Sequence, residues 1–86
     1  MHEATLLRDL MREILAIAER EGANRVVAIS VRLGDLSHLT PGHFEEHFVD
    51  ASRGTAAEGA RVHAVVSHDP AERGSIVLES VEVEEA

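Results

Sequence analysis

The chain has 86 residues with two Phe and no Trp, Tyr or Cys, so it is long enough for one domain but not for two, and its core must be mainly aliphatic. Its formal net charge of −8 at pH 7 disfavours nucleic acid and anionic membrane surfaces as partners. The lack of cysteine excludes disulfides and thiolate metal sites, and the small core leaves a homo-oligomer open as a further source of stability.

The first predicted element is an amphipathic helix over residues 5–21. Its apolar residues recur every three or four positions: Leu7, Leu10, Met11, Ile14, Ile17 and Ala18. Gly22 then suits the left-handed conformation in which many helices end. Charged residues such as Arg8 and Asp9 argue against a signal peptide, and no apolar run is long enough to cross a bilayer, so we expect a cytoplasmic protein.

A strand over residues 25–33 and a second helix follow. The apolar face of this strand consists of Val27, Ile29, Val31 and Leu33. After a loop, Thr40 and Pro41 provide an N-cap and a first-turn proline for the helix, which we expect to extend to about residue 53. The side of this helix that we expect to be buried carries Phe44, Phe48 and Ala51.

Two further strands are predicted over residues 61–67 and 75–84, and a polar turn at residues 69–74 separates them. In the first of these, Val62, Ala64 and Val66 share one face. We expect these last two strands to pair as a hairpin. The order helix, strand, helix, strand, strand predicts an α/β (α+β) fold with a three-stranded mixed sheet flanked by two helices. The pattern leaves the strand order open, and parallel pairing of the first two strands would require a right-handed crossover.

The first three residues, Met1, His2 and Glu3, form a candidate metal site. They place an α-amine, backbone amides and an imidazole within a few bonds of one another. This nitrogen set suits square-planar Ni(II) or Cu(II) better than tetrahedral Zn(II). The amine and the imidazole must lose protons before they bind, so affinity should fall as the pH drops. A histidine also occurs at position 2 by chance, and composition alone leaves that alternative open.

His43 and His47 are four residues apart on the second predicted helix and therefore share one face, a spacing that two metal-binding histidines use. The alternative is that they simply cover a solvated helix face. The remaining histidines outside the first turn are isolated: His38, His63 and His68. The sequence contains no glycine-rich phosphate loop and no Gly-x-Ser-x-Gly nucleophile motif, so we do not expect an enzyme.

The sequence resembles the HypA/HybF family of nickel metallochaperones over nearly its whole length. The residues that carry this resemblance are Met1-His2-Glu3, Gly22-Ala23, Leu33-Gly34-Asp35-Leu36-Ser37, Pro41 with Phe44 and Phe48, Thr55, Glu58-Gly59-Ala60 and Glu79-Ser80-Val81-Glu82-Val83. The resemblance implies a nickel site made by the Met1 amine, the His2 amide and imidazole, and the Glu3 amide. It also implies hydrogenase maturation, with a HypB-type GTPase and the hydrogenase large subunit as partners.

The chain departs from this family in one respect. Members of the family carry a zinc domain with two Cys-x-x-Cys pairs between the last two strands, whereas this chain has a short segment around residues 67–74 and no cysteine. We therefore expect no zinc and a single nickel-binding domain over residues 1–86, and regulated delivery of nickel is in doubt. Two hypotheses remain: a nickel metallochaperone, and a metal-free protein–protein interaction module on the same scaffold.

Overall fold

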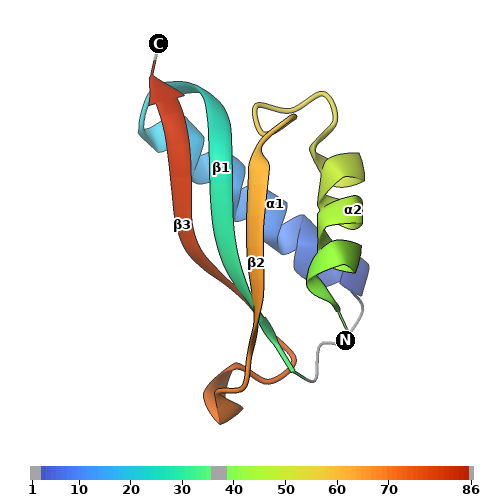
Figure 1. Ribbon diagram of the computed structural model, residues 1–86. Helices are drawn as coiled ribbons and strands as arrows, with labels where there is room; N and C mark the ends of the chain where they lie inside the picture. Colours follow the sequence, from blue (N-terminus) through green and yellow to red (C-terminus); the bar gives the residue numbers. More distant parts are fainter. Residues whose placement is uncertain (1–2, 36–38, 86) are drawn as a thin grey trace.

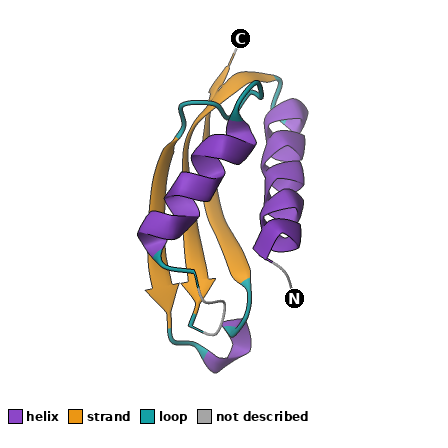
Figure 2. Ribbon diagram, turned by 90° about the vertical axis from the view of Figure 1, so that its right-hand side faces the viewer, coloured by secondary structure: helices purple, strands orange, loops and turns teal. Residues whose placement is uncertain are grey.

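The computed structural model describes residues 3–35 and 39–85, with side chains from residue 5 onward. These residues form a sheet layer and a helix layer (Figures 1 and 2). The elements are helix α1 (Glu3–Arg20), strand β1 (Ala23–Gly34), helix α2 (Pro41–Ser52), strand β2 (Arg61–Ser67), a short 3-10 helix η1 (Pro70–Glu72) and strand β3 (Ile76–Glu85). The predicted fold class and the predicted order of helices and strands are confirmed, with boundaries that differ by no more than a few residues.

The local signals that end and start the helices act as expected. Gly22 takes a left-handed φ of 65° just after α1. The Thr40 hydroxyl oxygen accepts a hydrogen bond of 3.2 Å from the His43 backbone N–H, and Pro41 occupies the first turn of α2. Among the described residues, no helix is both long enough and apolar enough to cross a membrane.

The sheet has the order β2-β1-β3, with β1 parallel to β2 and antiparallel to β3. The predicted hairpin between the last two strands is therefore wrong, because β1 lies between them. The parallel β1–β2 pair is joined through α2, as a crossover connection requires. Both edges of the sheet are consequently strands from the second half of the chain (Figure 1).

Gly34, at the end of β1, allows the chain to cross from one edge of the sheet to the other. Its N–H donates a hydrogen bond of 2.8 Å to the carbonyl oxygen of Ser75, just before β3. A Cβ at Gly34 would collide with the backbone carbonyl of Glu72 in η1. The connection between β2 and β3 thus lies directly on the last residue of the central strand, which explains why β3 joins the far edge instead of pairing with β2.

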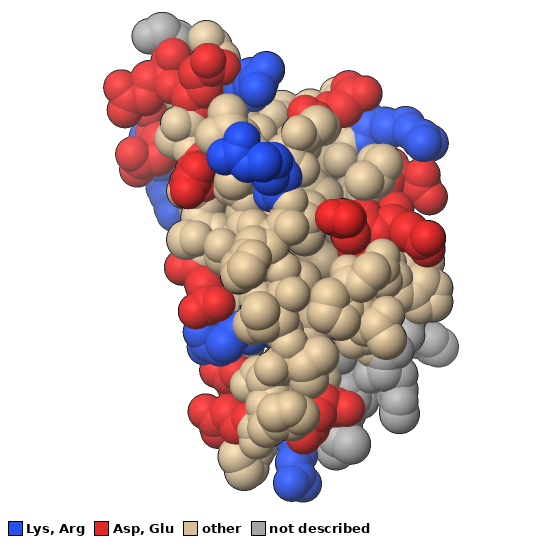
Figure 3. Space-filling model, in the orientation of Figure 1, with Lys and Arg blue, Asp and Glu red and all other residues tan. Residues whose placement is uncertain are grey.

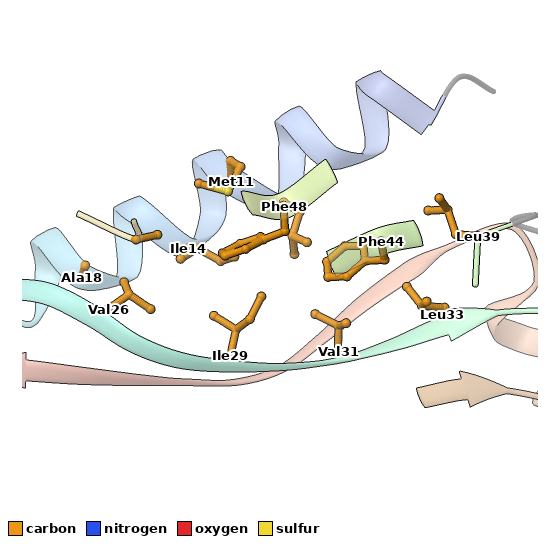
Figure 4. Packing of buried hydrophobic residues seen from close by; sticks show 12 residues of the cluster. Met11, Ile14, Ala18, Val26, Ile29, Val31, Leu33, Leu39, Phe44 and Phe48 are labelled. Carbon is orange, nitrogen blue, oxygen red and sulfur yellow. The ribbon is translucent and has the colours of Figure 1, made fainter. Parts of the chain in front are cut away.

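Both helices cover the same face of the sheet, and the core lies between the two layers (Figure 4). Helix α1 contributes Met11, Ile14 and Ala18, and α2 contributes Phe44 and Phe48. Facing them, the buried residues of β1 are Val26, Ile29, Val31 and Leu33. The two phenylalanine side chains are each only 1% exposed, so they provide much of the apolar area that holds α2 on the sheet.

Three predicted core positions differ from the structure. Val26 is buried and Val27 only half-buried, because an irregularity in the pairing with β3 between Val26 and Ala28 shifts which residues face the helices. In α2 the buried row continues from Phe48 to Ser52, four positions on, and leaves Ala51 exposed. Val66 stays 41% exposed near the end of an edge strand.

Candidate metal centre

Of the predicted metal ligands, only Glu3 is among the described residues. Met1 and His2 are outside the described residues, and Glu3 is the first residue of the helix. The first backbone N–H groups of any α-helix have no carbonyl partner within the helix, so the amide of Glu3 is not committed to the helical ladder. The nickel site at Met1, His2 and Glu3 therefore stays a prediction.

One turn beyond Glu3, the first half of α1, Leu39 and helix α2 line an apolar groove of about 520 Å³. We call it the α1–α2 groove. It is lined by Leu7, Arg8, Met11, Leu39, Phe44, His47 and Ala51. Figure 4 shows Phe44 between Met11 of α1 and Leu39. The groove thus lies beside the end of α1 that carries the predicted nickel ligands.

His43 and His47 stand side by side on the exposed surface of α2. Their ring centroids are 4.9 Å apart and the ring planes are tilted by 37°. His47 also borders the α1–α2 groove. The structure confirms that the two histidines share one helix face.

The other described histidines are isolated from this pair. His63 is exposed on β2. His68, just after β2, has its Nδ1 atom 3.7 Å from an Asp35 carboxylate oxygen. His38 lies outside the described residues. Within residues 3–35 and 39–85, no three His, Cys, Asp or Glu side chains are placed close enough to hold a metal ion.

Arg32, near the end of β1, contacts both the connection between β2 and β3 and strand β3 itself. Its Nε donates a hydrogen bond of 3.0 Å to Glu72 in η1, and its Nη1 lies 2.7 Å from a Glu79 carboxylate oxygen on β3. The Ser67 hydroxyl donates a hydrogen bond of 2.6 Å to the same Glu72 carboxylate. We call Arg32, Gly34, Ser67, Glu72 and Glu79 the crossing cluster.

The crossing cluster perturbs the ionisation of its charged groups. Hydrogen bonds from Arg32, and secondarily from Ser67, lower the pKa of Glu72 from 4.5 to about 2. The bonds to Glu72 and Glu79 raise the pKa of Arg32. Glu72 therefore stays ionised through the physiological range and anchors η1 to the sheet. No local pattern predicts this contact, because Arg32 and Glu72 are 40 residues apart.

The comparison with protein families identifies the chain. A family model described as "Hydrogenase/urease nickel incorporation, metallochaperone, hypA" matches residues 1–72, which is most of the chain. The chain belongs to the HypA family. The match begins at residue 1, so it includes the three predicted nickel ligands as well as α1, β1, α2 and β2.

Individual HypA proteins from archaea are similar to this chain. The hydrogenase maturation factor HypA of Archaeoglobus fulgidus is 36% identical over 66 residues, which cover 77% of this chain and 60% of that protein. HypA of Pyrococcus furiosus is 39% identical over 62 residues, covering 72% and 45% of the two chains. The matched region thus spans about half the length of these HypA relatives. They are named as maturation factors, in agreement with the expectation that the chain is not an enzyme.

A solved structure supports the fold. The solution structure of the Ni metallochaperone HypA from Helicobacter pylori superposes with a TM-score of 0.77, at 14% sequence identity and with both chains covered completely. At this level of identity, the likeness shows that the two proteins share an architecture. The arrangement of two helices on one face of a β2-β1-β3 sheet is therefore also found in an experimentally determined HypA structure.

Proposed function

We propose that this chain is a nickel metallochaperone that binds Ni(II) through the Met1 amine, the His2 amide and imidazole, and the Glu3 amide. It would deliver the ion for maturation of a nickel-iron hydrogenase. The observation that supports this most strongly is the HypA family match, which begins at residue 1. Hydrogenase is favoured over urease as the target because the archaeal relatives are named as hydrogenase maturation factors.

The chemistry of the three residues supports the same proposal. An amine and adjacent deprotonated amides offer nitrogen donors in a plane, and an imidazole completes the set that square-planar Ni(II) prefers. Because α1 begins at Glu3, the Glu3 amide has no helical acceptor to give up before it binds metal. A site built from the first residues of a chain is also accessible, which suits an ion that must be passed on by ligand exchange.

The proposal includes partners and a location. A HypB-type GTPase and the hydrogenase large subunit would exchange nickel with this site in the cytoplasm. The domain is proposed to work without zinc, because the sequence has no cysteine for a Cys-x-x-Cys zinc site. If nickel does not bind at neutral pH, the metal-free interaction module becomes the better description of the chain.

Isothermal titration of Ni(II) into three forms of the protein tests the proposal. The forms are the unmodified protein, the His2→Ala variant and protein acetylated at its α-amine. All eight basic residues other than histidine are arginines, so chemical acetylation of amines would be confined to the chain terminus. Mass spectrometry first establishes that Met1 is present and unblocked. His63→Ala, which removes an exposed histidine on β2, is the matched control.

We expect tight uptake by the unmodified protein and by His63→Ala. Uptake should weaken by at least tenfold in the His2→Ala variant and in the acetylated protein, because each loses one nitrogen of a chelate. Binding should also decrease as the pH falls below about 7, since the amine and the imidazole must be deprotonated. Equal affinity in all four forms would show that nickel binds elsewhere.

A further inference from the structure

We propose that His43 and His47 form a second metal site, an exposed two-histidine site on α2 that takes Ni(II) or a similar nitrogen-seeking divalent cation. This site is separate from the amino-terminal one and does not depend on it. The two histidines are four residues apart on an α-helix, a spacing that places both side chains over one turn.

The distance between the two rings fits a shared ion. A metal lies about 2.0–2.1 Å from a ligating imidazole nitrogen, so the centroid of each ring is roughly 3.2 Å from the metal. Two such rings in neighbouring ligand positions then have centroids roughly 4.5–5.2 Å apart. The observed separation of 4.9 Å falls within that range. The rings are tilted by 37° to each other, and both are exposed, so each can turn about its side-chain bonds when an ion binds.

The charge of α2 favours a cation. This helix carries Glu45, Glu46 and Asp50 and has no Lys or Arg within its bounds. Figure 3 shows acidic side chains over the region of α2, at the right of the view. Asp50 makes an ion pair of 3.2 Å with Arg53 just beyond the helix, and among the described residues no ion pair is found for Glu45 or Glu46. A cation on the neighbouring helix, Arg8, lines the groove that His47 borders. A negative surface raises the local concentration of divalent ions.

The pair differs from a catalytic metal site. The order His-x-x-Glu-His from His43 to His47 also occurs in a class of zinc peptidases, where a cleft and a further protein ligand complete the site. Here both histidines are exposed, and among the described residues no third donor joins them. Water would fill the other coordination positions, so we expect weak, rapidly exchanging binding rather than permanent retention.

His47 borders the groove beside the start of α1, so an ion held there would lie on the helix next to the one that carries the proposed amino-terminal site.

The test uses His2→Ala protein with an acetylated α-amine, which lacks both the imidazole and the free amine of the amino-terminal site. Ni(II) is titrated into this protein and into three derivatives: His43→Ala, His47→Ala, and His47→Ala combined with Ala51→His. The last derivative keeps the number of histidines but moves the second one to about 12 Å along the helix from His43, too far to share an ion. The variants His63→Ala and His68→Ala are matched controls for exposed histidines. Circular dichroism checks that all are folded.

We expect residual Ni(II) binding that weakens by roughly tenfold or more in each of the three derivatives and is unchanged in the two controls, because a second ligand on the same helix binds intramolecularly. Ni(II) should also broaden the ring-proton NMR signals of His43 and His47 before those of His63. No uptake by the parent protein, or equal uptake after the second histidine is moved to position 51, would overturn the proposal. The amino-terminal proposal is judged separately, by titrating His43→Ala/His47→Ala protein that has an unmodified start.

Discussion

Near the end of β1, the two faces of the sheet are held by different forces. At the α1–α2 groove the contacts are apolar, with Met11 and Phe44 only 7% and 1% exposed. At the crossing cluster they are polar, with Arg32 bound to Glu72 and Glu79 and with Ser67 donating to Glu72. The groove lies on the side covered by the helices, beside the first turns of α1, whereas the crossing cluster lies on the other side, at the short connection between β2 and β3.

The two regions have different structural roles. Apolar burial at the groove depends little on pH or salt, so it can hold α1 and α2 together over a wide range of pH. The crossing cluster takes no part in the proposed metal binding and fixes the path of the chain from β2 to β3. Substitutions in the groove and in the crossing cluster should therefore have effects of different size and with different responses to pH.

The largest effect is expected at the groove. Phe44→Ala should lower the free energy of unfolding by about 3–5 kcal/mol, because it removes a fully buried ring and leaves a cavity. The loss should be nearly independent of pH. Urea denaturation monitored by circular dichroism measures it. Val49→Ala, at a position on the same helix that is 49% exposed, should change the stability by less than about 0.5 kcal/mol. Equal effects at the two positions would mean that the groove is not a packed contact.

An intermediate effect is expected where the chain crosses β1. Gly34→Ala introduces a Cβ that collides with the backbone carbonyl of Glu72, and the connection must shift to relieve it. We expect a loss of about 1–3 kcal/mol in the same denaturation experiment. Gly42→Ala is the matched control: nothing lies within 4 Å of its added Cβ, and alanine is the better helix former in α2. A destabilised Gly42→Ala protein together with an unchanged Gly34→Ala protein would contradict this path of the chain.

The smallest effect, and the one with a distinctive pH dependence, is expected for Glu72→Gln. The pKa of Glu72 is lowered in the folded protein from 4.5 to about 2, so its ionised form stabilises the fold above pH 4.5 and this contribution is lost as the pH falls toward 2. The variant should therefore melt at a lower temperature than the unmodified protein at pH 7, and the gap should close between pH 4.5 and pH 2. Glu19→Gln, an exposed residue of α1 with no ion pair among the described residues, is the control. A gap that stays constant down to pH 2 would show that Glu72 contributes by packing alone.

Local chemistry made most of the fold predictable from the sequence. The Thr40-Pro41 pair predicts the start of α2, and Gly22 predicts the end of α1, because caps and left-handed glycines depend on neighbouring residues only. Strand pairing depends on distant residues instead. The hairpin prediction failed because nothing in the sequence near η1 reveals that its backbone lies on Gly34, and the half-buried Val27 reflects an irregularity set by pairing with β3.

Some features of the candidate site were also predictable from local sequence, and others were not. The spacing of His43 and His47 was sufficient to predict that they share a helix face, and the family resemblance seen in the sequence is confirmed by the HypA match. The α1–α2 groove was not predicted, because it forms between two helices that are separated by the whole of β1. The nickel ligands Met1 and His2 lie outside the described residues, so their prediction depends on their chemistry and on the family.

X-ray absorption spectroscopy of the nickel-loaded, unmodified protein at pH 7.5 tests the central claim most directly. The account predicts an ion in a planar arrangement of nitrogen ligands with one imidazole, as the Met1 amine, the His2 amide and imidazole, and the Glu3 amide would provide. The spectrum should change to that of an oxygen-rich, six-coordinate ion when the amine is acetylated. An oxygen-rich, six-coordinate spectrum from the unmodified protein itself would contradict the account.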